Sequence, residues 1–386
     1  MPKRTLEQSI ARGIRKATTE TDRIDLRLPP RLERAVGNLR TYAKAYYSRQ
    51  GRKGALSKVH DWSHVEGVAR HAKIFAEEMA RAQGLKNDEA KRIGLLAEAT
   101  GYAHDLVREK TEEIPHGPAS GEKLRQTFIQ HFDALATPRE RQGMGIAAFT
   151  LDEARQISKM AAIHEGSFKE VEEATKEMDP AKKIVAKALV IGDKVAEASG
   201  YRVLERRAYF VGKERFKKDL APLEKEYGEN APLYAVAMES CIRLRARNAL
   251  GNYPSWVWPI AQPLHKVQEE FYYGLLKRLG MDERQLLAEM KRIGFPATEK
   301  YEKSIGKNIP RNTSAMLKQT RAETAAAAEE LVRHFASSES PEKAIETMKP
   351  KTTKAAEWLE GIKGYRNPDA GYEARLRTAI RRNISA

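Results

Sequence analysis

Histidine is scarce in this chain, and its distribution is uneven. The sequence holds nine histidines, and five of them fall between His60 and His116. This stretch contains the motif HDWSH, which ends at His64, and the adjacent pair His104-Asp105. Imidazole nitrogens and carboxylate oxygens are ligands that iron, manganese, nickel and zinc accept. The stretch therefore points to a divalent metal site.

The surroundings of these residues strengthen that hypothesis. His104-Asp105 falls within IGLLAEATGYAHDLV, where nearly every residue is small or apolar, and Asp193 follows a second apolar run in ALVIGDKVAE. A carboxylate buried without a partner is strongly destabilising, so a buried aspartate normally faces a cation. His64 stands at the head of a third helix with an apolar face. We expect these four side chains to meet around a metal ion.

The order of these residues, His, then His-Asp, then Asp, resembles that of the HD-domain superfamily of metal-dependent phosphohydrolases. The resemblance covers roughly residues 57–204. It implies a helical bundle that holds one or two divalent ions (Mn, Fe, Ni, Zn or Mg). It also implies hydrolysis of a phosphoester or phosphoanhydride by water that the metal activates. Asp105 would then be both a ligand and essential for turnover.

Two further histidines refine the resemblance. His116 lies in PHGPASGE, and His164 ends a predicted helix in MAAIHEGS. In outline this is similar to the HD-type diadenosine tetraphosphate hydrolases, which implies that both histidines help to hold a second ion bridged by Asp105. The alternatives are a loop histidine at 116 and a helix-end histidine at 164. The sequence lacks the Gly-Tyr-Pro signature of the HD-GYP phosphodiesterases.

Two cations stand next to the expected ligands. Arg108 lies three residues after Asp105, which places both on one face of a helix. Lys194 directly follows Asp193. Either cation could bind a substrate phosphate, and Arg108 could also offset negative charge in the transition state. The alternative for both is an ordinary surface residue. The expected substrate is a phosphate-containing small molecule of the nucleotide type.

Helical periodicity predicts the elements that would position these residues. Helices are expected at about 31–47 and 63–83, from Asp88 through the His104-Asp105 pair, at 151–164, and from Pro180 onward. No alternating run is long enough to predict a strand. We therefore expect an all-α protein, an HD-domain helical bundle with additional N- and C-terminal helices. The expected regions are a basic N-terminal helical segment (1–54), the HD phosphohydrolase domain (55–275) and a basic C-terminal helical region (276–386).

Composition narrows the setting. Cys241 is the single cysteine of the 386 residues, so no disulfide can form within the chain. The N-terminus has no apolar signal-peptide core, and no window approaches eighteen uninterrupted apolar residues. These features favour a cytoplasmic protein without a membrane span. They do not predict its oligomeric state.

The formal net charge of +16 leaves other functions open. Basic residues crowd the first sixty positions, and the C-terminal tail carries Arg377, Arg381 and Arg382. One alternative is an HD nuclease or RNA phosphodiesterase whose basic termini follow a phosphate backbone. Another is a non-catalytic regulatory protein that keeps the fold and uses its metal structurally. Steep salt dependence of binding would distinguish the nuclease, and metal-dependent phosphate release would exclude the regulatory protein.

Overall fold

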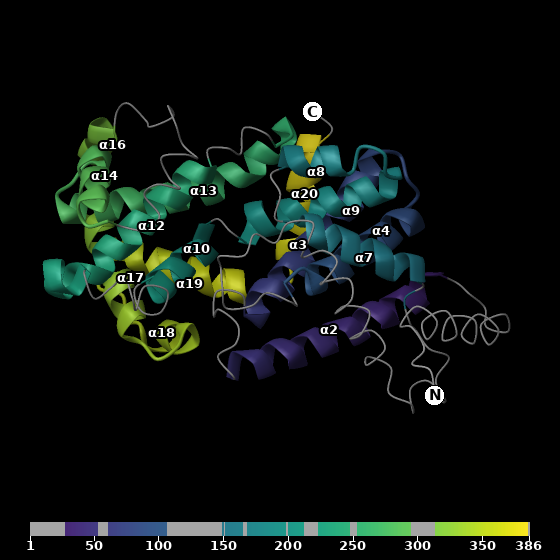
Figure 1. Ribbon diagram of the computed structural model, residues 1–386, viewed down its shortest axis with the longest axis horizontal. Coiled ribbons are helices and arrows are strands. Elements are labelled where there is room, and N and C mark those ends of the chain that lie inside the picture. Colours follow the sequence, from purple (N-terminus) through teal and green to yellow (C-terminus); the bar gives the residue numbers. More distant parts are fainter. Residues whose placement is uncertain are drawn as a thin grey trace. The chain divides into compact units, whose positions relative to one another are not determined.

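The computed structural model describes residues 28–52, 61–105, 149, 151–164, 168–197, 200–211, 223–247, 253–294 and 313–384. All secondary structure within these ranges is helical, so the predicted all-α class is confirmed (Figure 1). The chain divides into two compact units. The first comprises Met1–Val195 and Arg375–Ala386, and the second comprises Ala196–Ala374. The predicted region 55–275 runs across this division.

The first unit is a bundle built around helix α3. Its helices within the described ranges are α2 (Leu28–Arg52), α3 (Trp62–Ala82), α4 (Asn87–Ala103), α7 (Leu151–Ile163), α8 (Phe168–Ala174) and α9 (Pro180–Ile191), with most of the C-terminal helix α20 (Tyr372–Ile384). Helix α3 packs mainly against α4 and α9, and α2 and α7 pack against α4. The π-helical turn η2 (Gly192–Glu197) continues directly from α9.

The sequence pattern explains why α3 lies at the centre. Val65, Val68, Ala72 and Phe75 recur at helical spacing, and all four are buried. The predicted span of 63–83 agrees with the observed helix to within one residue at each end. Because the buried positions extend around much of the helix, α3 can accept neighbours on more than one side.

Helix α2 begins earlier than the sequence suggested. The sequence predicted a helix at about 31–47, after Pro29 and Pro30, yet the helix runs from Leu28 to Arg52. Both prolines therefore lie in its first turn. There the missing N–H has no intrahelical partner to lose, and the fixed φ of proline suits a helix.

Two glycines allow close packing on α3. A Cβ atom added at Gly101 of α4 would lie 2.4 Å from the Cα of Ala69. One added at Gly192, at the start of η2, would lie 3.0 Å from the backbone nitrogen of Ala72. The absence of a side chain at both positions lets the backbones of α4 and η2 approach α3 closely. Both contacts lie just before residues expected to bind metal.

The second unit is also a helical bundle. Its helices include α10 (Gly200–Arg206), α12 (Ala231–Arg247), α13 (Trp258–Leu279), α14 (Glu283–Arg292), α16 (Thr313–Gln319), α17 (Ala322–Ser337), α18 (Pro341–Thr347) and α19 (Thr353–Arg366). It also contains a second π-helical turn, η3 (Arg207–Val211), and the short 3-10 turns η4 (Gly228–Asn230) and η6 (Ser255–Val257). Helix α13 packs against α10, α12 and α17. Its core includes the edge-to-face pair Phe271 and Trp358, with ring centroids 5.6 Å apart.

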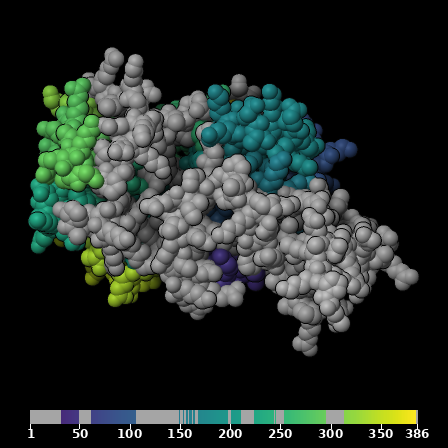
Figure 2. All heavy atoms as spheres, in the orientation of Figure 1, coloured from purple at the N-terminus to yellow at the C-terminus, as the bar shows by residue number. Residues whose placement is uncertain are grey.

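Helices α8 and α9 lie at the surface of the first unit, where Figure 2 shows their side chains in teal. Lys187 and Glu172 form an ion pair on this surface at 2.7 Å. None of the helices in the described ranges is both long and apolar enough to cross a membrane.

Candidate metal centre

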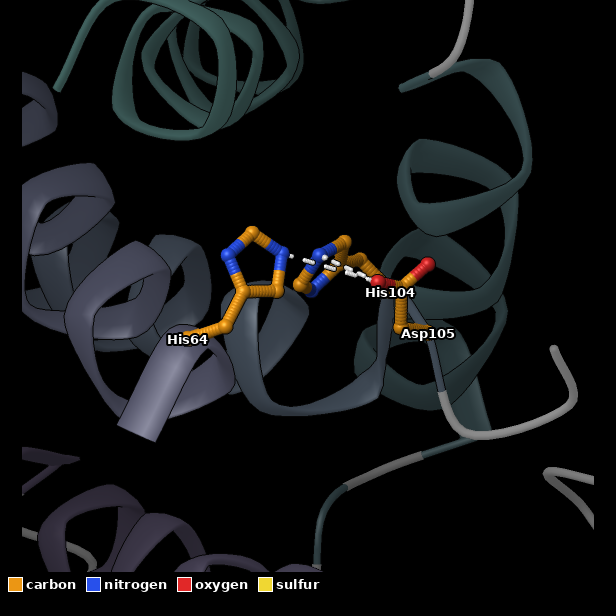
Figure 3. Close-up of side chains that lie close together, drawn as sticks. All are labelled: His64, His104 and Asp105. Atoms are coloured by element: carbon orange, nitrogen blue, oxygen red, sulfur yellow. Dashed lines mark ion pairs between the residues drawn. The ribbon is translucent and has the colours of Figure 1, made fainter. Parts of the chain in front are cut away.

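His64 lies in the first turn of α3, where the helix N-terminus fixes its backbone. Asp61 is the N-cap residue, and its carboxylate accepts a hydrogen bond from the His64 N–H at 2.9 Å. This bond satisfies one of the backbone N–H groups that the helix cannot bond internally. The His64 ring is buried and points toward His104 and Asp105 (Figure 3). The polar start of α3 thus presents an imidazole to the interior.

His104 and Asp105 follow the last residue of α4, and both are buried. Nδ1 of His104 lies 2.6 Å from the carbonyl oxygen of Gly101. A carbonyl oxygen can only accept, so Nδ1 must carry the proton and donate. Nε2 is then the atom that can take up a second proton or a metal ion. This Nε2 atom is buried and lies 3.3 Å from Oδ2 of Asp105.

His164 repeats this arrangement at the end of α7. Its Nδ1–H donates to the carbonyl oxygen of Ala161 at 2.5 Å, so its Nε2 is also the available ring nitrogen. The centroids of the His104 and His164 rings are 5.0 Å apart. Backbone carbonyls that fix histidine tautomers in this way commonly support metal-binding histidines.

Asp193 comes from the π-helical turn that extends α9. It is the second residue of η2, and its side chain is 18% exposed. Its Oδ1 atom lies 3.5 Å from Nε2 of His64. Single π-helical turns within helices are rare and frequently occur at functional sites, because they alter the direction of the side chains in the turn. The turn therefore explains how the end of α9 supplies a carboxylate to the cluster.

The carboxylate of Asp105 is shared by the three histidines. Its Oδ2 atom lies 3.3 Å from His104 Nε2 and 3.6 Å from His64 Nε2, while its Oδ1 atom lies 3.7 Å from His164 Nε2. Ligands about 2.1 Å from one ion are about 3.0 Å apart in an octahedral site and about 3.4 Å apart in a tetrahedral site. The observed spacings exceed the usual length of a direct hydrogen bond. They are close to those of metal ligands.

The charges within the cluster perturb one another strongly. Burial opposes a charged His104 ring, but the Asp105 and Asp193 carboxylates outweigh it and raise the His104 pKa to about 9. Burial and the neighbouring His104 lower the pKa of His164 to about 4. Burial would raise the pKa of Asp193, but the surrounding histidines lower it to about 2. The two carboxylates thus favour positive charge at the centre of the cluster.

The structure brings together five of the six residues predicted as ligands: His64, His104, Asp105, Asp193 and His164. One ligand atom from each of His64, His104 and Asp105 lies within 4.8 Å of the others. His116, the sixth, lies outside the described residues, as does Arg108. Lys194 follows Asp193 in η2 and is half-buried.

Sequence reasoning missed the residues that support these ligands. Gly101 combines close packing on Ala69 with the carbonyl that orients His104, and Gly192 brings the chain close to α3 just before Asp193. The signal was present as a glycine shortly before His104 and another directly before Asp193, each after an apolar helical run. Such glycines are unfavourable in helices unless packing requires them.

No family model, curated protein or solved structure matches this chain. The chemical interpretation of the cluster therefore rests on its residues and their geometry.

Proposed function

We propose that this chain is a metal-dependent phosphohydrolase of the HD kind, which cleaves a phosphoester or phosphoanhydride in a nucleotide-type substrate. The observation that carries the proposal is the convergence of His64, His104, Asp105 and Asp193 from three separate parts of the chain into one cluster. Their order along the chain is that of the HD superfamily. Their spacing suits the coordination of an ion.

Each residue has a distinct role in this proposal. His64, His104, Asp105 and Asp193 would hold a divalent ion such as Mn²⁺, Fe²⁺, Ni²⁺, Zn²⁺ or Mg²⁺. The two oxygens of Asp105 face different histidines, which would suit a bridge to a second ion held with His164 and His116. Bound there, divalent metal would supply the Lewis acidity that activates water and polarises a phosphoryl oxygen. Arg108 and Lys194 would bind the substrate phosphate, and Arg108 would offset charge in the transition state.

The C-terminal arginines bear on the alternative of a nucleic-acid substrate. Arg377 donates to Glu77 at 2.7 Å and to Glu78 at 3.0 Å, and Arg381 donates to Glu78 at 2.5 Å. Both guanidinium groups form ion pairs with carboxylates of the same unit. Two of the three tail arginines that could have followed a phosphate backbone are therefore engaged within the unit, which weakens the tail's part in the argument for a nuclease.

The test begins with metal analysis of the purified protein. Hydrolysis of nucleotides, dinucleotides and oligonucleotides is then measured with added Mn²⁺, for the wild type, Asp105→Ala and the surface control Glu172→Ala. We expect Mn²⁺-dependent release of phosphate or of a nucleotide by the wild type and by the control, and none by Asp105→Ala. Equal turnover by Asp105→Ala would overturn the proposal. A metal-loaded protein that hydrolyses none of these substrates would support a regulatory role, and preference for oligonucleotides with steep salt dependence would support a nuclease.

A further inference from the structure

Trp62 and Tyr102 stack on each other next to the candidate metal centre. Trp62 is the first residue of α3, and Tyr102 is the last residue but one of α4. Their ring centroids are 5.8 Å apart and their planes differ by 8°. This is the nearly parallel, offset arrangement that aromatic pairs favour. The stack joins the ends of the two helices that carry His64 and His104.

Each aromatic residue of the stack stands at the same spacing from a histidine of the cluster. Trp62 precedes His64 by two residues, and Tyr102 precedes His104 by two residues. Two steps along an α-helix turn a side chain by about 200°. The aromatic rings therefore leave their helices on roughly the opposite side from the imidazoles. The stack can tie the helix ends together without occupying the space in which an ion would bind.

A polar chain anchors the tyrosine. Tyr102 is buried, and its hydroxyl donates to Oε1 of Glu98 at 3.3 Å. The Oε2 atom of Glu98 lies 2.8 Å from Nζ of Lys73, and this ion pair links α4 to α3. Arg40 of α2 also reaches α3, through a hydrogen bond to Glu66 at 2.5 Å. The ring of Tyr102 is thus held in place, and Trp62 packs against a fixed surface.

The ligands need such support because of where they lie. His64 is in the first turn of its helix, and His104 and Asp105 follow the last turn of theirs. Helix ends lack several intrahelical hydrogen bonds and open more readily than helix interiors. Separation of these two ends would move His64 away from Asp105 Oδ2, which now lies 3.6 Å from its Nε2 atom.

We propose that Trp62 and Tyr102 are positioning residues, an aromatic brace that holds His64 at the correct distance from His104 and Asp105. The effect on metal affinity rests on the proposed function. The effect on the geometry of the two helix ends does not. Trp62→Ala removes the stack, whereas Trp62→Phe keeps an aromatic ring against Tyr102. Ile74→Val is the matched control, a core substitution on α3 about 15 Å along the helix axis from His64.

The three variants and the wild type are compared by calorimetric titration of the metal-free protein with Mn²⁺ and by amide hydrogen exchange. We expect Trp62→Ala to bind Mn²⁺ about 10-fold more weakly, in keeping with the energy of an aromatic pair. We also expect faster exchange in peptides that span 62–66 and 100–105. Trp62→Phe should restore most of both properties, and Ile74→Val should lower the thermal midpoint without changing either.

Two results would overturn the brace: unchanged exchange at 100–105 in Trp62→Ala, or an equal loss of Mn²⁺ affinity in Ile74→Val. If the wild type itself binds no Mn²⁺, the proposed metal site fails. The exchange comparison then still decides whether Trp62 holds the two helix ends together.

Discussion

Helix α3 contributes to two clusters of buried carboxylates, one near its start and one near its end. At the start, His64 faces Asp105 and Asp193, with histidine rings as the neighbouring polar groups. Toward the end, Glu77 and Glu78 face the guanidinium groups of arginines. Both clusters belong to the first unit, and in both the carboxylates need compensating positive charge.

The two clusters meet that need in different ways. The carboxylate of Glu78 accepts hydrogen bonds from Arg81 at 2.6 Å, Arg377 at 3.0 Å and Arg381 at 2.5 Å. Guanidinium groups carry permanent charge, so this cluster is complete without any outside partner. The histidines around Asp105 stand 3.3–3.7 Å from its oxygens and must be neutral to bind metal. The first arrangement is structural, and the second is suited to an exchangeable ion.

The largest expected effect comes from removing the shared carboxylate of the histidine cluster. Asp105→Ala should lower turnover by about 1000-fold or more, because it removes a ligand from the group expected to activate water. Bound Mn²⁺ measured on the purified variant should fall in parallel. Glu172→Ala, which changes an exposed carboxylate of α8, should leave both unchanged. Full metal content in Asp105→Ala would show that its carboxylate is not a ligand.

Removal of the Glu78 carboxylate should lower the stability of the fold and leave metal binding unchanged. Glu78→Ala leaves the guanidinium group of Arg381 without its partner Glu78 and leaves Glu77 as the carboxylate facing Arg377 and Arg81. Loss of a charge-assisted hydrogen-bond partner costs about 1.5–3 kcal/mol in the free energy of unfolding, because the remaining arginines are partly exposed and Glu77 still faces two of them. Urea unfolding would measure this loss, and calorimetry should show unchanged Mn²⁺ affinity. A marked loss of affinity would mean that the two clusters are coupled along α3.

Metal should stabilise the first unit through the histidine cluster alone. Saturation with Mn²⁺ at 100 times its dissociation constant should raise the free energy of unfolding by about 2.7 kcal/mol. A chelator should reverse the gain. In thermal unfolding, Mn²⁺ should stabilise Glu78→Gln by the same amount as the wild type, although the metal-free variant is less stable. Mn²⁺ should not stabilise Asp105→Ala. An equal increment in Asp105→Ala would place the binding ion elsewhere.

The stability that Glu78 contributes to the arginine cluster should depend on pH in the acid range. Burial would raise the pKa of Glu78, but hydrogen bonds from Arg381 and Arg377 outweigh it and hold this pKa below its ordinary value of 4.5. A lowered folded-state pKa gives stability that is complete above the unfolded value and is lost as pH falls through the folded one. The free-energy difference between the wild type and Glu78→Gln should therefore be constant at neutral pH and shrink below about pH 4.5. A difference that persists into strong acid would contradict this.

The smallest effect belongs to the outermost arginine. The side chain of Arg381 is 59% exposed, although its partner Glu78 is fully buried. Arg381→Ala should cost less than about 1 kcal/mol, because solvent screens the pair and two other arginines remain. The cost should shrink further in high salt. A salt-independent loss in urea unfolding would show that Arg381 contributes by packing instead.

Local patterns in the sequence predicted the helical class and the residues of the histidine cluster. Apolar spacing predicted α3 to within a residue, and placed His104, Asp105 and Asp193 in or just after apolar helices. Those signals are short in range, since a buried acid beside an apolar run needs a partner wherever the run packs. They identified which residues should meet, and five of them do.

Contacts between distant segments required the folded structure. Arg377 and Glu77 are 300 residues apart, and no periodicity in either segment indicates that they pair. No sequence pattern predicts three further features. They are the division after Val195, the π-helical turn that carries Asp193, and the stack of Trp62 on Tyr102. Helical spacing specifies which face of a segment is apolar but not which segment covers it. Which helix packs against each apolar face is determined only by the packing of the whole bundle.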